Sequence, residues 1–233
     1  MTISLIHVNP KTGLSASITA TGGVAVGGYV NHSWRNLGGC ATQGLYTNPW
    51  YAEQARKCLS QGMSARETIE HLKMGDPEFS KRQCMVMDRL GSSAFIHGED
   101  NIAVVGSIAL PTVAVAGNML ESQSVLDAFC NSFLEQTVLN FASVKTGAEP
   151  EYRQDYESQL PETLIAALAA ALRAGGDKRG TFSASLRIES LTHAPIDIRV
   201  DWADGDLIDA LTKVLSHVRE ASFQEFLSHL PNK

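Results

Sequence analysis

The chain opens with Met1-Thr2-Ile3-Ser4-Leu5-Ile6-His7-Val8, an apolar stretch that predicts a β-strand directly behind the initiator methionine. Apolar side chains are more frequent in this stretch than in a strand that buries only one of its faces. We therefore expect Thr2–Val8 to be an interior strand of a sheet.

The second residue also carries a chemical hypothesis. Thr2 is small enough for methionine aminopeptidase to remove Met1, which would leave a hydroxyl and a free α-amine on one residue. A free α-amine has a pKa near ~8 and can serve as a general base close to neutral pH. Threonine with its own amine is a known activated nucleophile. The same Met-Thr opening also begins many proteins without such chemistry, so both interpretations stay open at this point.

Length and composition indicate one globular domain, residues 1–233. Hydrophobic residues make up 44% of the chain and charged residues 19%, which is ordinary for a folded protein. The formal net charge of −6 argues against nucleic acid or an anionic membrane as the main partner. The sequence shows neither a signal peptide nor an apolar run long enough to span a bilayer, so we expect a cytoplasmic protein.

Cysteine and histidine usage gives no indication of a metal site. The four cysteines, Cys40, Cys58, Cys84 and Cys130, are widely scattered and form no Cys-x-x-Cys pair. They are typical of small buried side chains in a reducing compartment. None of the seven histidines forms an i, i+4 pair on a predicted helix. We expect no metal and no cofactor.

The predicted elements occur in clusters of strands and pairs of helices. The predicted strands are Thr2–Val8, Leu14–Ala20, Leu37–Gln43, Gln83–Asp88, Ala94–His97, Val113–Ala116, Ser183–Glu189 and Ile196–Asp201. The predicted helices are 49–61 after the N-cap Asn48, 65–73 after a capping box at Ser64, Ser122–Gln136, Leu160–Ala174, and Asp206–Leu230 with a break near 220–222. Residues 143–157 are predicted as a loop. This order favours an α+β fold with hairpin-rich, mainly antiparallel sheets.

Several short strings then follow one another in a recognisable order. They are Ala41-Thr42-Gln43-Gly44 with Asn48-Pro49, Arg82-Gln83 running to Met87-Asp88, Ala116-Gly117-Asn118-Met119-Leu120, Gly175-Gly176-Asp177-Lys178-Arg179-Gly180 with Ser183-Ala184, and Ile196-Asp197-Ile198-Arg199-Val200-Asp201. In this order and spacing the chain resembles the DUF1028 family, which is classed with the N-terminal nucleophile (Ntn) hydrolases. The resemblance covers essentially the whole chain.

The resemblance implies a four-layer αββα sandwich, in which two mainly antiparallel sheets pack face to face between two helical layers. Members of the superfamily cleave amide bonds with an N-terminal Thr, Ser or Cys. Simple members such as the bacterial proteasome-like protease expose a threonine merely by losing methionine. By resemblance, Thr2 is therefore the expected nucleophile.

The resemblance also implies three residues around this nucleophile. In Ntn folds a backbone N–H at a strand-to-helix turn helps bind the oxyanion, a role worth roughly 3 kcal/mol. That turn corresponds to Gln43-Gly44, with Gly44 in the catalytic role and Gln43 in substrate binding. Asn118 follows a strand, where its amide could orient the nucleophile or hold a substrate carbonyl. A turn glycine and an Asn bonded to its own turn are the structural alternatives.

Asp177 and Arg179 lie between a predicted helix and a predicted strand. Their charges could bind a polar substrate or polarise the N-terminus. An acid–base pair that fixes the loop is the alternative, and the glycine spacing does not match a phosphate-binding loop.

We therefore expect an Ntn-type amidohydrolase that acts on an amide bond of a small metabolite and forms a homodimer. The alternative is a non-catalytic binding or scaffold protein with the same fold. Two departures favour the alternative. The chain has no lysine between Lys11 and Lys57, where proteasome-type relatives tune the nucleophile, and it has Thr21-Gly22-Gly23 where many family members have Ser-Arg.

Overall fold

The first strand of the chain lies in the middle of a six-stranded antiparallel sheet. The computed structural model describes residues 2–177 and 179–231, so the expected removal of Met1 concerns a residue outside the described part. The strand order is β10-β9-β2-β1-β8-β7. The bounds are β1 Thr2–Asn9, β2 Leu14–Thr21, β7 Gly106–Leu110, β8 Val113–Asn118, β9 Ser183–Glu189 and β10 Ile196–Val200. The interior position expected for the first strand is confirmed.

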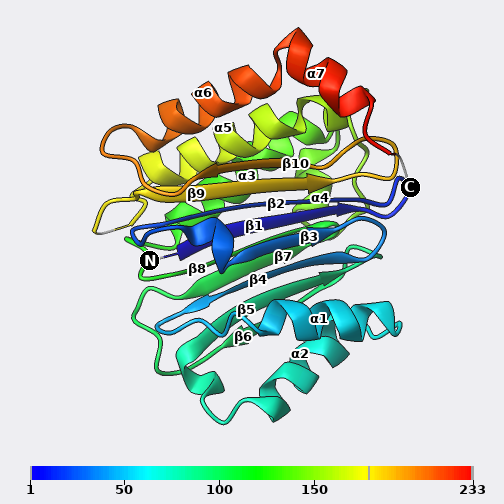
Figure 1. The fold of residues 1–233 in the computed structure, drawn as a ribbon. Helices are drawn as coiled ribbons and strands as arrows, with labels where there is room; N and C mark the ends of the chain where they lie inside the picture. The colour runs from blue at the N-terminus through cyan, green and yellow to red at the C-terminus, as the bar shows by residue number, and fades with distance from the viewer. Residues whose placement is uncertain (1, 178, 232–233) are drawn as a thin grey trace.

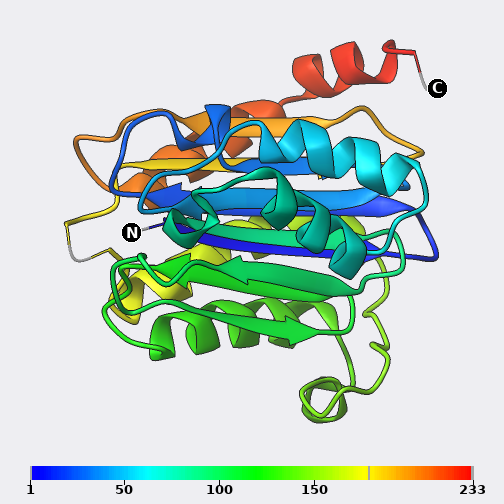
Figure 2. The same ribbon diagram turned by 90° about the horizontal axis from the view of Figure 1, so that it is seen from below.

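A second, four-stranded antiparallel sheet stacks against the first. Its order is β3-β4-β5-β6, with bounds β3 Asn31–Trp34, β4 Gly38–Gly44, β5 Arg82–Asp88 and β6 Ser93–His97. Residues of β4 contact β1, and residues of β3 contact β2 and β9, so the two sheets face each other. Helices α1 (Tyr51–Ser60) and α2 (Ala65–Gly75) cover its outer face, and Figure 2 shows them in front of the sheet.

The remaining helices lie on the outer face of the six-stranded sheet. Figure 1 shows α5 and α6 above the strands and α3 behind them, and α3 contacts β7, β8 and β1. Their bounds are α3 Ser124–Thr137, α4 Phe141–Val144, α5 Leu160–Arg173, α6 Leu207–Val218 and α7 Ala221–Ser228, and the short 3-10 turns are η1 Val26–Gly28, η2 Phe79–Lys81 and η3 Tyr156–Gln159. The described part of the chain is thus a mixed α+β fold of two antiparallel sheets with helices outside both.

Strand alternation divides the interior into layers of different chemistry. On β1, Ile3 and Leu5 belong to the apolar core shared with α3 and α5. Ser4 points the other way, between the sheets, where its hydroxyl donates to the Gln43 side chain at 2.7 Å. Because successive side chains of a strand alternate between faces, one strand serves both layers.

Several predicted boundaries need correction. The first helix begins at Tyr51 instead of 49, because the Asn48 side chain accepts a hydrogen bond from the Trp50 N–H in a turn that precedes the helix. The capping box at Ser64 is confirmed, and the break in the last helix falls between Val218 and Ala221. The strands β3 and β7 were missed, since both are short edge strands that depend on pairing with β4 and β8.

Among the residues that the structure describes, none of the helices combines the length and the apolar character needed to cross a bilayer. The four cysteines are buried, which agrees with the role expected for them. The closest pair of them is Cys40 and Cys84, whose Sγ atoms lie 3.7 Å apart on neighbouring strands.

Candidate functional site

Thr2, at the start of β1, belongs to a polar row that crosses one end of the six-stranded sheet. In the antiparallel register Thr2 pairs with Thr21 of β2 on one side and with Asn118 of β8 on the other, and Thr21 pairs in turn with Ser183 of β9. The hydroxyls of Thr2 and Thr21 are hydrogen-bonded at 3.1 Å. Two threonine hydroxyls and an amide side chain therefore share one end of the sheet, with Thr2 in the middle.

The opposite sheet supplies two glutamines that face this row. Gln43 of β4 pairs with Gln83 of β5, and the Gln43 Nε2 donates both to the Gln83 Oε1 at 2.7 Å and to the Thr2 carbonyl at 3.1 Å. The Asn118 Nδ2 donates to the same Gln83 oxygen at 3.0 Å. Three buried amide side chains thus connect the two sheets next to Thr2: Gln43 holds β1 to β4, and the bond between Asn118 and Gln83 holds β8 to β5.

Gly44 follows Gln43 at the end of β4. Its φ of +130° and its surroundings explain the glycine: a Cβ here would lie 2.6 Å from the Lys81 carbonyl oxygen and 2.7 Å from the Gln83 nitrogen. A side chain would therefore push β4 away from β5. The position of Gly44 is consistent with the expected turn, while a role of its N–H in oxyanion binding stays a prediction.

Asp177 lies beside the same end of the sheet. Its Oδ2 accepts a hydrogen bond from the Gly22 N–H at 2.9 Å, directly after Thr21, and its backbone bridges to Leu120, two residues beyond Asn118. A Cβ at Gly22 would come within 2.6 Å of the carboxylate oxygen. Gly22, noted above as part of a departure from the family pattern, therefore leaves the space that the Asp177 carboxylate occupies.

Arg179 holds the Asp177 carboxylate. Its backbone N–H and its Nε donate to the Asp177 Oδ1 at 2.9 and 3.2 Å, and its Nη2 contacts the Oδ2 at 3.1 Å. Burial raises the pKa of Asp177, while the hydrogen bonds from Arg179 are foremost among the interactions that lower it, and the pKa stays below its usual value. Asp177 is therefore a carboxylate at neutral pH. Asp177 and Arg179 thus form the acid–base pair that was the structural alternative for this loop. A further role of the two residues in substrate binding stays a prediction.

The structure thus brings Thr2, Gln43, Asn118 and Asp177 to one end of the sandwich. Sequence reasoning did not include Gln83 and Thr21 in this group, although both are central to it. One signal could have found Gln83: it is a polar residue in the strand Gln83-Cys84-Met85-Val86-Met87, which is otherwise apolar. A buried amide in such a strand needs partners, and partners imply a polar layer.

The side chains around Thr2 are mainly hydroxyls and amides. Among the described side chains, that of Thr21 is the one hydrogen-bonded to the Thr2 hydroxyl. Within residues 2–177 and 179–231, no group of three or more histidine, cysteine or acidic side chains could hold a metal ion.

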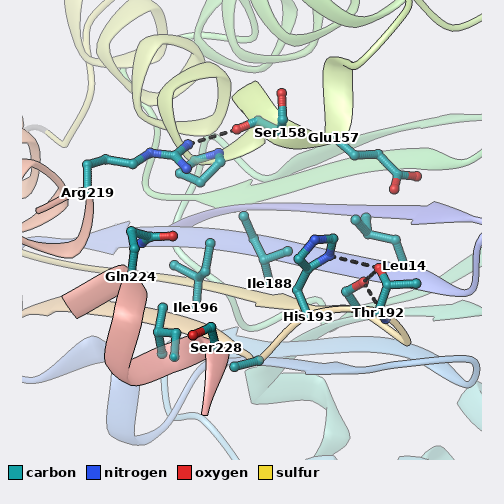
Figure 3. Close-up of a pocket in the computed structure, with 14 residues that line it drawn as sticks. Leu14, Glu157, Ser158, Ile188, Thr192, His193, Ile196, Arg219, Gln224 and Ser228 are labelled. Carbon is teal, nitrogen blue, oxygen red and sulfur yellow. Dashed lines mark hydrogen bonds between the residues drawn. The ribbon is translucent and has the colours of Figure 1, made fainter. Parts of the chain in front are cut away.

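A hollow of about 480 Å³ lies at the opposite end of the sheet (Figure 3), beneath α7. It includes Leu14, which is seven residues along β2 from Thr21, or roughly 23 Å at ~3.3 Å per residue. Its charged groups are used locally: Arg219 binds Glu162 and the Ser158 carbonyl, and Glu157 accepts from Asn9. This hollow therefore contributes nothing to the Thr2 site.

Comparison with known proteins agrees with this fold. The model of a family of unknown function, DUF1028, matches residues 2–211. A solved structure of protein SPO2555 from Silicibacter pomeroyi, assigned to the same family, is 27% identical to this chain with a TM-score of 0.83. The alignment covers 99% of this chain and 92% of that one. No curated protein matches the chain. Because the family model spans most of its length and a solved member has the same fold, the chain belongs to the DUF1028 family.

Proposed function

We propose that this protein is an Ntn-type amidohydrolase that cleaves an amide bond in a small metabolite, with Thr2 as nucleophile after removal of Met1. The observation that carries the proposal is the position of Thr2. It is the first residue of an interior strand, with its hydroxyl held by Thr21 and with Asn118 and Asp177 at the same sheet end.

The reaction would proceed in two halves. The free Thr2 amine removes the proton from its own hydroxyl, and Oγ1 attacks the amide carbonyl carbon. The proton then passes to the leaving nitrogen as the C–N bond breaks, and an acyl ester remains on Thr2. Water, deprotonated by the same amine, hydrolyses this ester and regenerates the hydroxyl. Support for the amine as base is that, among the described side chains, the hydroxyl's hydrogen-bond partner is another hydroxyl.

The surrounding residues would then have distinct roles. Gly44 would supply a backbone N–H to the oxyanion, and Asn118 would position the substrate carbonyl next to Thr2. Gln43 holds the Thr2 carbonyl, so its effect on substrate would be exerted through the position of β1. Asp177 with Arg179 forms a charged wall at the sheet end that suits a polar amide.

The experiment compares four forms of the protein against a library of small amides. Thr2→Ala removes the nucleophile and should abolish turnover, while Thr2→Ser should keep part of it. A variant that retains one residue ahead of Thr2 has an amide in place of the amine and should be as inactive as Thr2→Ala. Full activity in that extended variant would exclude the amine as base, and full activity of Thr2→Ala would refute the proposal.

A non-catalytic role in binding is the second candidate, and one observation favours it. The amide donors nearest Thr2 are already engaged, since Asn118 donates to Gln83 and Gln43 donates to both Gln83 and Thr2. A catalytic site would have to free a donor for the oxyanion. The intact mass of the natively expressed protein separates the two candidates, because retained Met1 would block the amine and refute catalysis by this route.

A further inference from the structure

A second hollow, of about 570 Å³, lies on the side of the sandwich where β3 forms the edge of the four-stranded sheet. The larger sheet continues past this edge, so side chains of β9 and β10 form one wall. Residues of β3 form another, and Arg56 of α1 and the η1 glycines Gly27 and Gly28 complete it. We call this hollow the β3 cleft.

The β3 cleft is strongly cationic although the chain carries a net charge of −6. Arg35, Arg56, Arg187 and Arg199 all line it. Arg187 is paired with Glu189 and Asp197, and Arg199 is paired with Asp197. Four arginines against these two carboxylates leave a net charge of +2.

Two of these arginines are available to a ligand. In the part of the chain that the structure describes, neither Arg35 nor Arg56 forms an ion pair. Arginine presents its donors in a planar fork that matches the oxygens of a carboxylate or phosphate group. An anion entering the cleft would therefore find donors that are not already engaged by acidic side chains.

Two buried polar atoms of residues that line the cleft, the Asn31 Oδ1 and the His32 Nε2, have no partner among the described residues. Asn31 is only 4% exposed, and its Nδ2 donates to the Ser17 hydroxyl and the Ser185 carbonyl between the sheets. Because both atoms are buried, they lie behind the surface of the cleft, and the arginines are the charged donors that a ligand meets there.

We propose that the β3 cleft is a binding site for a small anion, a carboxylate or phosphate group. Arg35 and Arg56 bind the anionic oxygens, while Arg187 and Arg199 add positive potential from the opposite wall.

The site is separate from Thr2. Arg199 pairs with Ser185 and Ser185 pairs with Thr19, so three strand spacings, roughly 14 Å, separate β10 from β1. Binding in the β3 cleft therefore needs no chemistry at Thr2, and the proposal stands independently of the amidohydrolase function.

His32 provides a local reporter. Burial lowers the pKa of His32, and the positive charges of Arg187 and Arg199 lower it further, against a hydrogen bond to the Tyr29 backbone. Glu189 and Asp197 are the acidic groups on the same wall, and Arg56 faces it from α1. A bound anion would offset the arginine charges and raise the pKa of His32.

The test is an NMR titration of the full-length protein with inorganic phosphate and acetate at constant ionic strength. Phosphate should shift the His32 ring signals and the Gly27 and Gly28 amides at millimolar concentrations, and should raise the pKa of His32. Acetate, which carries one charge and two oxygens, should bind more weakly. The absence of any shift with phosphate would overturn the site, and equal affinity for acetate and phosphate would overturn the joint role of Arg35 and Arg56.

Variants separate this site from general charge effects. Arg56→Gln should weaken phosphate binding roughly five- to tenfold. Arg66→Gln, the same charge change on an exposed position of α2, should leave binding unchanged, and so should Thr2→Ala. Equal losses of phosphate affinity in Arg56→Gln and Arg66→Gln would show that only the net charge matters. A loss of phosphate affinity in Thr2→Ala would contradict the separation of the β3 cleft from the Thr2 site. Concentration-dependent self-association that Arg56→Gln abolishes, without any response to anions, would assign the cleft to a second copy of the chain.

Discussion

Two of the buried interfaces of this sandwich differ in chemistry although β1 and β2 take part in both. Toward α3 and α5, strands β1 and β2 present a continuous apolar surface: Ile3, Leu5, Leu14, Ala16, Ile18 and Ala20. Toward the other sheet, the same strands present mostly hydroxyls: Thr2, Ser4, Ser15, Ser17, Thr19 and Thr21. The layer between the sheets also holds an apolar cluster that includes Ile6, Val8, Met85 and Met87, but most hydrogen bonds between side chains of β1 and β2 and their neighbours lie there.

The difference has a functional consequence. Burial of apolar surface is non-directional and tolerates small shifts, whereas hydrogen bonds between side chains depend on distance and angle. The hydroxyl and amide layer therefore determines how the two sheets are aligned, and with them Thr2 relative to Gln43 and Asn118. The apolar layer supplies the free energy that allows such a polar layer to stay buried.

Deleting a large side chain from the apolar layer should give the largest effect. Phe129 of α3 is fully buried in the core between α3, α5 and the sheet. Phe129→Ala should lower the free energy of unfolding by about 3–5 kcal/mol, measured by urea denaturation. Phe226→Ala, at a position 55% exposed on α7, is the matched control and should change stability by less than ~0.5 kcal/mol. Similar losses in both would contradict the assignment of stability to this layer.

The apolar layer contains one titratable exception on β1. His7 is fully buried against Phe133, and its ring nitrogens contact the Thr112 carbonyl and the Tyr156 hydroxyl. Burial lowers the pKa of His7 to about 4, against a hydrogen bond to Thr112 that raises it. The unfolded chain binds this proton near the ordinary pKa of ~6.5, so stability should fall as the pH drops from 6.5 to 4, by ~3 kcal/mol.

Urea denaturation across that pH range measures the effect of His7. The slope between pH 6.5 and 4 should diminish in His7→Gln, which keeps an amide able to hydrogen-bond but does not titrate. An unchanged slope in His7→Gln would assign the acid sensitivity to other groups.

Removing the central amide of the polar layer should have an intermediate effect. Gln83→Met keeps the volume but leaves the Asn118 Nδ2 without its acceptor and the Gly117 carbonyl without its donor. We expect a loss of about 2 kcal/mol. Gln54→Met, on the exposed face of α1, should be nearly neutral. A neutral Gln83→Met would mean that this layer relaxes around the loss and does not align the sheets.

A single hydroxyl in the same layer should matter least. Ser33 of β3 donates to the Ser17 hydroxyl at 2.9 Å across the sheets, and Ser17 also accepts from Asn31. Ser33→Ala removes one donor but leaves no buried acceptor without a partner, because the Ser17 hydroxyl still accepts a hydrogen bond from Asn31. The expected loss is about 1 kcal/mol or less. A double-mutant cycle with Ser17→Ala measures their coupling, and a coupling of zero would contradict the hydrogen bond.

Local sequence patterns were enough to predict most of the helices and strands, but not the edge strands of the two sheets. Apolar runs, turn residues and capping signals located β1, β2, β5 and the box at Ser64. They missed β3, because Asn31-His32-Ser33-Trp34 has no apolar alternation of its own. This segment is a strand through its pairing with β4 and through the contacts of Asn31 and Ser33 with Ser17.

The sequence by itself determined the α+β class, the interior position of the first strand, and the family to which the chain belongs. These follow from local periodicity, turn residues and ordered motifs, all of which are readable along the chain. Only the tertiary structure decided that Gln43 and Gln83 face Thr2, that Gly22 admits Asp177, and that arginines converge in the β3 cleft. Such contacts join strands far apart in the sequence. Their partners depend on how two sheets stack, which no local pattern specifies.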